Sequence, residues 1–509
     1  MNHWILVPII LPSLAAPLIV LAARQDIVLQ RCFSISSTAG MLAVSLFLLG
    51  QAISGPPQLY ELGNWPSPFG IVMVLDRLSA MMVTLTSLLA LLVLLYAIQA
   101  WDTRGRHFHA LFQFQLMGLA GAFLTGDLFN LFVFFEVLLI ASYGLMLHGA
   151  GAERLSAGFQ YVVINLAGST LFLVAVGTIY AVTGTVNMAD LAVRVPLVPE
   201  ADQGLLRTGG LLLLVVFAIK GALVPLHFWL PRTYAAASAP VAALFAIMTK
   251  VGAYSIIRVF TLIFGDGAGE VAWLAQPWLI PAALATMTLG MIGVVAARSL
   301  RWLICFATVG SMGTLLAAIG VFNSEALAGG LYYLLHSTLI VAVLFLIADQ
   351  VAQRRGDHGD SLASASSYPQ MGLLAGFFFL AAIAMVGMPP LSGFVGKLLI
   401  LDSVRASSYG PWIWAFVLGT SVLALLGFAR AGSQLFWKPS ALPAGEAVQE
   451  EVALLPLIAI ALLLSGIVAL TAFSGPVTAF LYATADQLID PADYIAAVLN
   501  SRPVPAQGL

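Results

Sequence analysis

The chain has 509 residues, of which 61% are hydrophobic and 9% are charged, with a mean hydropathy of +1.00. Soluble domains carry about 25% charged residues, so this composition indicates a membrane protein. The formal net charge of −2 argues against a nucleic-acid or strongly acidic partner. Cys32 and Cys305 are the two cysteines and form no metal or redox motif, so no metal site and no cofactor is expected.

Apolar segments of roughly 20 residues or more follow one another along the chain, and about fourteen of them are predicted to cross the membrane as helices. The sequence therefore predicts an all-α polytopic membrane protein. The tail at 476–495 is expected to form a short surface helix. The predicted segments, in chain order, are residues 4–23, 32–52, 75–100, 108–125, 128–148, 157–184, 207–230, 239–264, 274–297, 301–321, 325–349, 369–402, 411–437 and 453–473.

Lysine and arginine are distributed differently along these segments. Lys220, Lys250 and Lys397 lie within apolar segments, whereas nearly every arginine falls at a helix end or in a loop. A charge at bilayer depth costs roughly 2.5–3.5 kcal/mol on insertion scales. A buried lysine can release its proton, whereas arginine keeps its charge. Three lysines at such positions therefore predict a proton pathway.

The seventh and twelfth segments each combine a lysine with proline. Pro225 follows Lys220 by five residues, and the pair Pro389 and Pro390 precedes Lys397. Proline removes a backbone hydrogen bond and breaks a helix. In membranes such breaks are tolerated where they are buried in protein or line a wet cavity. Two broken helices are expected here, and two ordinary proline kinks are the alternative.

Broken segments at corresponding positions of two halves indicate an inverted repeat. The offset of five helices is odd, so the two copies would run through the membrane in opposite directions. This arrangement also predicts that Lys220 lies in the half of the proton path connected to one side of the membrane and Lys397 in the half connected to the other. The predicted divisions are residues 1–100 for helices 1–3, 108–264 and 274–437 for the two repeats, and 453–509 for helix 14 and the tail.

Two further titratable residues lie inside predicted helices. Glu136 is the carboxylate placed deepest, and Lys220 is its expected partner, which would keep both groups charged. A neutral glutamate bonded to a backbone carbonyl is the alternative. His336 is expected to relay protons between the lysines. A neutral histidine held by Ser337 or a tyrosine is the alternative.

Several polar residues are candidates for accessory roles. His227, just after the first break, is expected to have a structural role. Asp349 and Asp402 lie near predicted helix ends, where they mark either proton mouths or solvated caps. Membrane helices also use hydroxyl and amide side chains for packing, so a water-carrying role is one of two interpretations for Tyr234, Ser238, Asn165, Ser169 and Thr170.

The distribution of basic residues predicts the orientation, because cytoplasmic loops are enriched in lysine and arginine. The predicted helices separate the basic residues outside the three buried lysines into two groups, the larger of which is expected to be cytoplasmic. Both termini are then expected on the outer side. The larger group is Arg24, Arg31, Arg104, Arg106, Arg154, Arg232, Arg298, Arg301, Arg354, Arg355, Arg430 and Lys438, and the smaller is Arg77, Arg194, Arg207, Arg258, Arg405 and Arg502.

Three segments of the chain resemble a known family. They are KGALVPLHFWLPRTYAAASAPVAALFAIMTKVGAY, GMPPLSGFVGK and the segment around Glu136. The chain resembles the antiporter-like subunits shared by respiratory complex I and Mrp-type cation/proton antiporters, over about residues 70–440. The segment GDLFNLFVFFEVLLIASYGLM is more similar to the Mrp branch than to complex I.

The resemblance implies a subunit of a heteromeric Na⁺/H⁺ antiporter of the bacterial cell membrane, which is a transporter subunit and not an enzyme. It implies a larger A-type subunit and several small membrane subunits as partners, with Na⁺, Li⁺ or K⁺ as the cation and no flavin, quinone or iron–sulfur cluster. A proton-pumping subunit of complex I or of a membrane-bound hydrogenase is one alternative, and a structural scaffold is another. The implied proton pathway comprises Lys220, Lys250, His336 and Lys397, tuned by Glu136.

Overall fold

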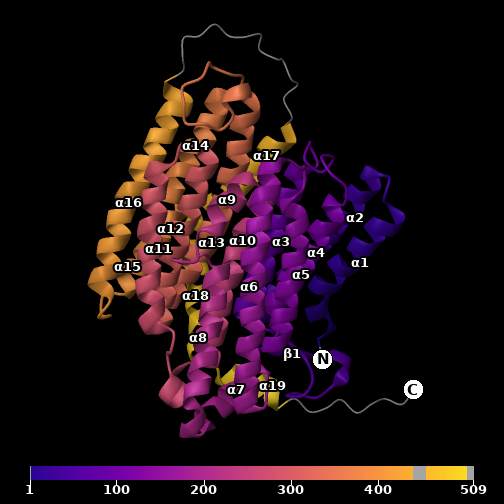
Figure 1. Cartoon of the computed structure of the whole chain (residues 1–509), viewed down its shortest axis with the longest axis vertical. Helices are drawn as coiled ribbons and strands as arrows, with labels where there is room; N and C mark the ends of the chain where they lie inside the picture. The colour runs from indigo at the N-terminus through magenta and orange to yellow at the C-terminus, as the bar shows by residue number, and fades with distance from the viewer. Residues whose placement is uncertain (1, 439–453, 501–509) are drawn as a thin grey trace.

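The structure is a computed structural model that describes residues 2–438 and 454–500, which form a bundle of long helices lying side by side (Figure 1). Within these residues, 12 helices are long and apolar enough to cross a membrane, and Phe108–Leu124 and Met371–Val386 are shorter apolar helices. The prediction of an all-α multi-pass membrane protein is therefore confirmed. The exact number of crossings stays a prediction, and Arg502, used in the orientation, lies outside the described residues.

The helix bounds lie close to the predicted segments. The long helices are α1 (Val7–Ala22), α2 (Ile27–Ser54), α3 (Arg77–Ala97), α4 (Phe108–Leu124), α5 (Leu128–Met146), α6 (Ala152–Thr183), α8 (Gln203–Lys220), α10 (Ala239–Leu262), α11 (Gln276–Ala296), α12 (Leu300–Ile319), α13 (Ser324–Arg354), α14 (Met371–Val386), α15 (Ser392–Ser403), α16 (Gly410–Gly432), α17 (Leu454–Ala472) and α18 (Ser474–Ile489). Shorter elements are β1 (Gln58–Glu61), β2 (Val72–Leu75), α7 (Met188–Arg194), α9 (Trp229–Ala236) and α19 (Ala492–Leu499).

Polar side chains fix where several of these helices begin. Asp76 precedes α3 and accepts a hydrogen bond from the backbone N–H of Ser79 at 2.8 Å, while the Ser79 hydroxyl accepts one from the backbone N–H of Asp76. Asp127 caps α5 in the same way through the N–H of Asn130 at 2.7 Å. Side chains of this kind satisfy backbone donors that the first turn leaves unpaired.

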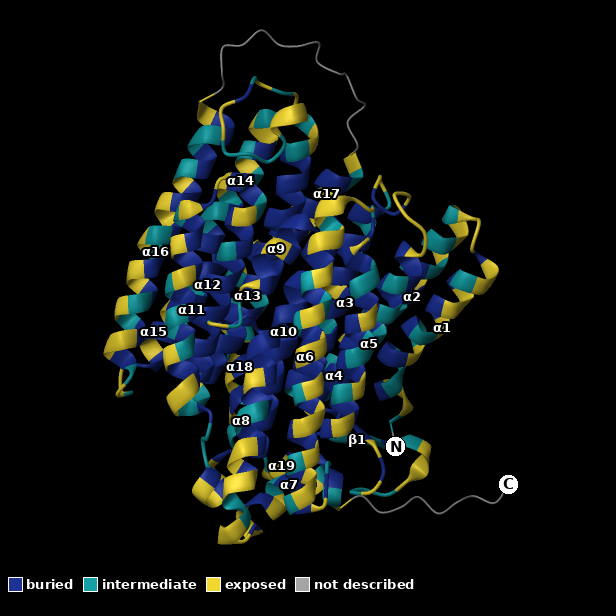
Figure 2. Cartoon of the chain, viewed as in Figure 1, coloured by how far each residue is buried: buried dark blue, intermediate teal, exposed yellow. Residues whose placement is uncertain are grey.

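Burial increases toward the centre of the bundle (Figure 2). In the most apolar stretch of α10 every residue is buried, and α13 and α12 are 94% and 89% buried over theirs. The outer helices α2 and α16 are only 33% buried and carry apolar side chains on their exposed faces. A helix with an apolar exposed face is compatible with lipid, whereas the polar residues of α10 are enclosed by protein.

One end of the bundle is formed by α7, α19 and β1, and is called here the α19 end (Figure 1). β1 and β2 form an antiparallel ribbon with Gln58 opposite Leu75, which the all-helical prediction did not include. The N-terminal turn His3–Leu6 and α19 both contact β1. The first and last described helices therefore start and finish at the same end, and which side of the membrane it faces stays a prediction.

The expectation of a short surface helix at 476–495 is wrong. The segment forms most of α18 and the first half of α19, and α18 packs along α13, with Leu481 and Ala485 fully buried. Leu481, Ala485 and Leu488 recur at helical spacing, so one face of α18 fits against a central helix. The helical period is visible in the amino-acid pattern, but the partner that covers this face is not.

The close contact between α10 and the end of α8 depends on Gly252. A Cβ at this position would lie 2.6 Å from the backbone nitrogen of Gly221 and 2.8 Å from the carbonyl oxygen of Phe217. We expect Gly252→Ala to push α10 away from α8 and to destabilise the fold by about 1–3 kcal/mol, measured as a lower thermal unfolding midpoint. Gly177→Ala on α6, where a Cβ meets nothing within 4 Å, should not lower the midpoint.

Asp127 gives a pH-dependent prediction because its side chain is buried outside the long helices. Burial raises the pKa of this carboxyl to about 6, against the smaller opposite effect of backbone N–H donors. The stability that the protonated form contributes is present below its ordinary pKa of about 3.9 and is lost as pH rises through about 6.

We therefore expect Asp127→Asn, which keeps the helix cap without the charge, to stabilise the fold at pH 8 by about 3 kcal/mol or less and to have little effect at pH 4. Thermal unfolding at the two pH values measures this difference. Asp26→Asn is the control, because Asp26 caps α2 in the same way but is exposed. An equal gain at both pH values would contradict the prediction.

Candidate proton pathway

The helices that carry the predicted pathway residues pack in series. α5 packs on α6, α6 on α8, α8 on α10, α10 on α13, and α13 on α15. Helices far apart in the sequence thereby become neighbours in one series through the bundle. In that order, α5 carries Glu136, α8 carries Lys220, α10 carries Lys250, α13 carries His336 and α15 carries Lys397.

Glu136 and Lys220 are linked through α6 and not by a direct ion pair. The Ser169 hydroxyl donates a hydrogen bond to Glu136 Oε1, and Lys220 Nζ donates to Asn165 Oδ1 at 2.8 Å. Asn165 and Ser169 are four residues apart and share one face of α6. Within the described residues, Glu136 and Lys220 therefore do not bond each other directly; each bonds a different side chain of α6, which lies between them. Lys220 Nζ also lies 5.7 Å from the ring centroid of Phe135.

Lys250 is the most isolated of the three lysines. Its side chain is fully buried, and the one hydrogen bond from Nζ is a long contact of 3.5 Å with the hydroxyl of its neighbour Thr249. Among the described residues no carboxylate lies within 4 Å of Lys220, Lys250 or Lys397. A buried ammonium without a counter-ion favours its neutral form, so Lys250 is suited to release a proton.

His336 and Lys397 meet at the second helix break. The Nδ1 atom of His336 lies 2.9 Å from the hydroxyl of Ser392, the first residue of α15. Lys397 Nζ donates to the carbonyl of Val386 and to the hydroxyl of Ser421, both at 2.8 Å. Val386 is the last residue of α14, so Lys397 bonds a carbonyl that the break has freed.

Both predicted breaks are present, at 221–228 between α8 and α9 and at 387–391 between α14 and α15. At the first, the Trp229 indole N–H donates to the carbonyl of Ile219 at 3.0 Å. Pro225, Pro389 and Pro390 lie within these breaks, and their side chains are exposed on the surface of the described chain.

The two breaks are approached from opposite ends, since α8 runs inward from the α19 end and α14 from the other (Figure 1). This agrees with an inverted arrangement, and the repeat boundaries stay a prediction. Lys220 ends α8 and precedes its break, whereas Lys397 is in α15 and follows its own. Both half-helices lie between the breaks and the α19 end (Figure 1). Which side of the membrane each lysine is connected to stays a prediction.

The accessory candidates have different positions. His227 lies within the first break, partly buried, with no hydrogen-bond partner for Nδ1 among the described residues. The buried Tyr234 hydroxyl donates to the carbonyl of Phe245 at 2.9 Å. Asp402 is exposed near the end of α15 and pairs with Arg405 at 3.1 Å.

Asp349 is buried at the end of the bundle opposite α19. Its carboxylate accepts hydrogen bonds from the Tyr96 hydroxyl at 2.7 Å and the Trp101 indole at 2.8 Å, and it lies 3.7 Å from Arg301. Asp349 is on α13, thirteen residues beyond His336. Of the two aspartates expected at helix ends, this one is enclosed by protein.

One buried ion pair was not predicted from the sequence. Arg258 was assigned to the solvated basic residues because it is near the end of its segment. In the structure Arg258 Nη1 lies 2.6 Å from Asp76 Oδ2, and the two side chains are 4% and 1% exposed. The available signal was spacing. Arg258 follows Tyr254 by four residues and Lys250 by eight, so the three share one face of a helix that the structure buries on all sides.

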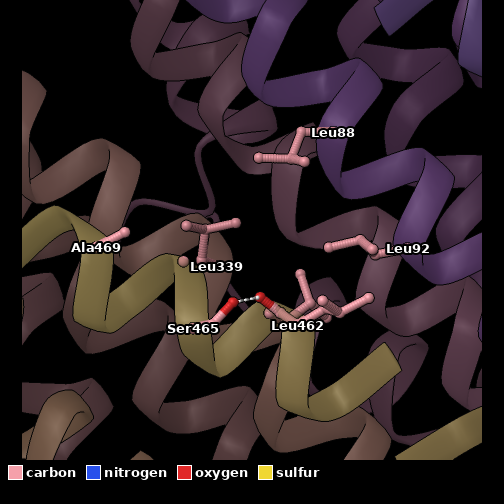
Figure 3. Close-up of a pocket in the computed structure, with 8 residues that line it drawn as sticks. Leu88, Leu92, Leu339, Leu462, Ser465 and Ala469 are labelled. Atoms are coloured by element: carbon pink, nitrogen blue, oxygen red, sulfur yellow. Dashed lines mark hydrogen bonds between the residues drawn. The ribbon is translucent and has the colours of Figure 1, made fainter. Parts of the chain in front are cut away.

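A cavity of about 260 Å³ between α3, α13 and α17 is not part of this line (Figure 3). Its one polar lining side chain, Ser465, donates a hydrogen bond to the Leu462 carbonyl at 2.7 Å and offers no free donor. The cavity is suited to apolar contacts and not to proton transfer. The lining residues are Leu88, Leu92, Leu339, Leu462, Leu463, Ser465, Gly466 and Ala469.

Comparison with known proteins matches this architecture to antiporter subunits. The chain is 39% identical to a protein of Rhizobium meliloti named as the D subunit of a probable K⁺/H⁺ antiporter, over 98% of both chains. It is 39% identical to the D subunit of a Na⁺/H⁺ antiporter of Alkalihalophilus pseudofirmus and 37% identical to that of Bacillus subtilis, over 98% of this chain and 100% of each relative.

Solved structures share the fold over nearly the whole chain. A chain of the Mrp complex from Dietzia sp. DQ12-45-1b is 28% identical with a TM-score of 0.87, covering 98% of this chain and 100% of that one. A chain of an archaeal membrane-bound sulfane sulfur reductase, 24% identical, has a TM-score of 0.88 over 98% of this chain and 100% of that one, and shows the fold alone. The model of the family described as NADH:quinone oxidoreductase/Mrp antiporter, TM, matches residues 125–424. With that match and full-length relatives above 30% identity, the chain belongs to the family of transmembrane subunits shared by NADH:quinone oxidoreductase and Mrp antiporters.

Proposed function

We propose that this chain is the D-type subunit of a heteromeric monovalent cation/proton antiporter and conducts its protons. The observation that carries the proposal is the line of buried lysines, without carboxylate partners among the described residues, on helices that pack in series. The antiporter names of relatives at 37–39% identity support it. Those names include both Na⁺ and K⁺, so the cation is proposed as a class.

Protons are proposed to move between Lys220, Lys250, His336 and Lys397 by way of water and hydroxyl groups. Each group can accept a proton in its neutral form and pass it on, which a permanently charged arginine cannot do. Asp349 is proposed as the mouth at the end opposite α19, because it is a buried carboxylate on the same helix as His336. Tyr234 and His227 are proposed to support the first break structurally.

The proposed partners are a large A-type subunit and several small membrane subunits, in the bacterial cell membrane with both termini outside. The match to a chain of an Mrp complex supports a multi-subunit assembly. Glu136 offers a second argument, since this carboxylate is only partly buried on a face of α5 whose neighbouring side chains, such as Val133 and Ile140, are exposed and apolar. A partner helix over that face would remove Glu136 from lipid.

The experiment is to purify the native complex, identify its subunits and measure cation-driven proton movement in vesicles. An antiporter predicts small membrane partners and exchange that follows an imposed Na⁺ or K⁺ gradient. Cysteine-rich redox partners, together with no exchange under either gradient, would contradict the proposal. They would favour the alternative of a proton-pumping subunit in a redox complex.

Glu136 is proposed to tune Lys220 through α6, which gives a prediction for Glu136→Gln. The amide keeps the shape and can still accept from Ser169, but it removes the negative charge. Lys220 should then release its proton at a lower pH, because an opposite charge nearby favours the charged form of a group. We expect a large fall in exchange rate and a pH optimum shifted downward, measured in everted vesicles.

Ser169→Ala is the matched variant, since it removes the hydrogen bond and leaves the charge, and it should shift the optimum less. An unchanged pH profile at full rate would exclude the coupling.

A further inference from the structure

The Asp76–Arg258 ion pair lies at the α19 end, on the face of α10 that also carries Lys250. Lys250, Tyr254 and Arg258 are spaced four residues apart, so they follow one another along one helix face at steps of about 6 Å. The Tyr254 hydroxyl donates to the Phe123 carbonyl at 2.6 Å. This face leads from the middle of the bundle to the Asp76 carboxylate.

The C-terminal helix α19 covers this ion pair. The guanidinium carbon of Arg258 lies 5.1 Å from the ring centroid of Tyr494, and the Tyr494 side chain is buried. α19 is held by contacts with α7 and β1 and follows α18, whose Gln487 accepts a hydrogen bond from the backbone N–H of Arg77 at 3.2 Å. A short terminal helix held at a few points opens at lower cost than a central helix.

Two polar atoms at this contact have no hydrogen-bond partner among the described residues. They are Arg258 Nε and the Tyr494 hydroxyl, and both are buried. Buried polar groups are nearly always paired with protein or water, so two such atoms at one contact indicate a place that water would occupy when the contact opens. An ion pair that only held the fold together would be expected to have its donors satisfied.

We propose that the Asp76 carboxylate, held in its ion pair by Arg258, is the port through which protons pass between Lys250 and the α19 end, and that Tyr494 of α19 is its cover. With Tyr494 in place, its ring excludes water from the ion pair. When α19 moves, water reaches Arg258 and the Asp76 carboxylate, and a proton can then be exchanged with that side. The proposal rests on the proposed function, because it assigns an end to the same pathway.

Removing the ring tests the cover. The full complex, with each Tyr494 variant in turn, is reconstituted in vesicles in choline medium, and a pH jump drives proton leak that an entrapped pH dye reports. Tyr494→Ala should raise the leak several-fold, whereas Tyr494→Phe, which keeps the ring and loses the hydroxyl, should match the wild type. No increase with alanine, or an equal increase with both variants, would overturn the cover.

A labelling experiment keeps the test open if Tyr494→Ala does not assemble. Ile495→Cys, next to Tyr494 and partly buried, is introduced with Cys32→Ala and Cys305→Ala. A membrane-impermeant thiol reagent added at the α19 end should label it several-fold faster under an imposed cation gradient than without one. Asp493→Cys, exposed on the same helix, should label equally in both conditions.

The outcomes separate the port from the proposed function. Adding Lys250→Met to the Ile495→Cys variant should abolish the effect of the gradient on labelling. A complex that exchanges cations for protons normally but labels Ile495→Cys at one rate with and without the gradient overturns the cover alone. A wild-type complex with no exchange contradicts the proposed function instead.

Discussion

Lys220→Ala is expected to abolish cation/proton exchange while the complex still assembles. Lys220 is the last residue of α8, its side chain is 6% exposed, and Nζ donates to Asn165 at 2.8 Å. Alanine removes the group that accepts and releases the proton, and a positioned acid–base group typically contributes about 100-fold or more to a rate. Exchange in everted vesicles measures activity, and co-purification of the other subunits measures assembly.

Two matched variants separate proton transfer from charge. Lys220→Arg should fail like alanine, since arginine keeps its proton at working pH. Lys438→Ala should exchange normally, because Lys438 is exposed just after the turn Ser433–Trp437 that follows α16. If Lys220→Ala exchanged at nearly the wild-type rate in an assembled complex, Lys220 would not belong to the pathway.

Lys250→Met is expected to lose exchange and, at the same time, to stabilise the fold. Lys250 is fully buried, and its one hydrogen bond is the 3.5 Å contact with Thr249. Replacing buried charged groups by apolar side chains of similar volume is often stabilising by about 1–4 kcal/mol, and methionine is flexible enough to fill the same space. A higher thermal unfolding midpoint together with absent exchange would show that Lys250 is kept for proton transfer although it lowers the stability of the fold.

Lys220→Met is the comparison for this prediction, since it also breaks a 2.8 Å hydrogen bond and leaves Asn165 Oδ1 unpaired. It should therefore gain less stability than Lys250→Met, or lose some. Exchange by Lys250→Met at the wild-type rate would remove Lys250 from the pathway. A fall in the unfolding midpoint would mean that the ammonium is stabilised by interactions other than those with the described residues.

Features that depend on a local stretch of chain could be predicted from the sequence. The membrane class follows from apolar segments of bilayer length, and the two interruptions follow from proline, which cannot continue a helix. The pathway lysines could be identified locally too, because Lys220, Lys250 and Lys397 are charged residues inside apolar segments. The family resemblance added the expected function to that local reading.

Lateral relations between helices were decided only by the tertiary structure. In a membrane helix every face is apolar, so hydrophobic period does not tell which face meets which neighbour. The sequence therefore paired Glu136 with Lys220 directly, whereas α6 lies between them and supplies Ser169 and Asn165. The sequence also predicted that Arg258 is solvated, whereas in the structure it forms a buried ion pair with Asp76 at the start of α3. Segment length and breaks are encoded along the chain, but contacts between side chains on different helices arise only when those helices pack.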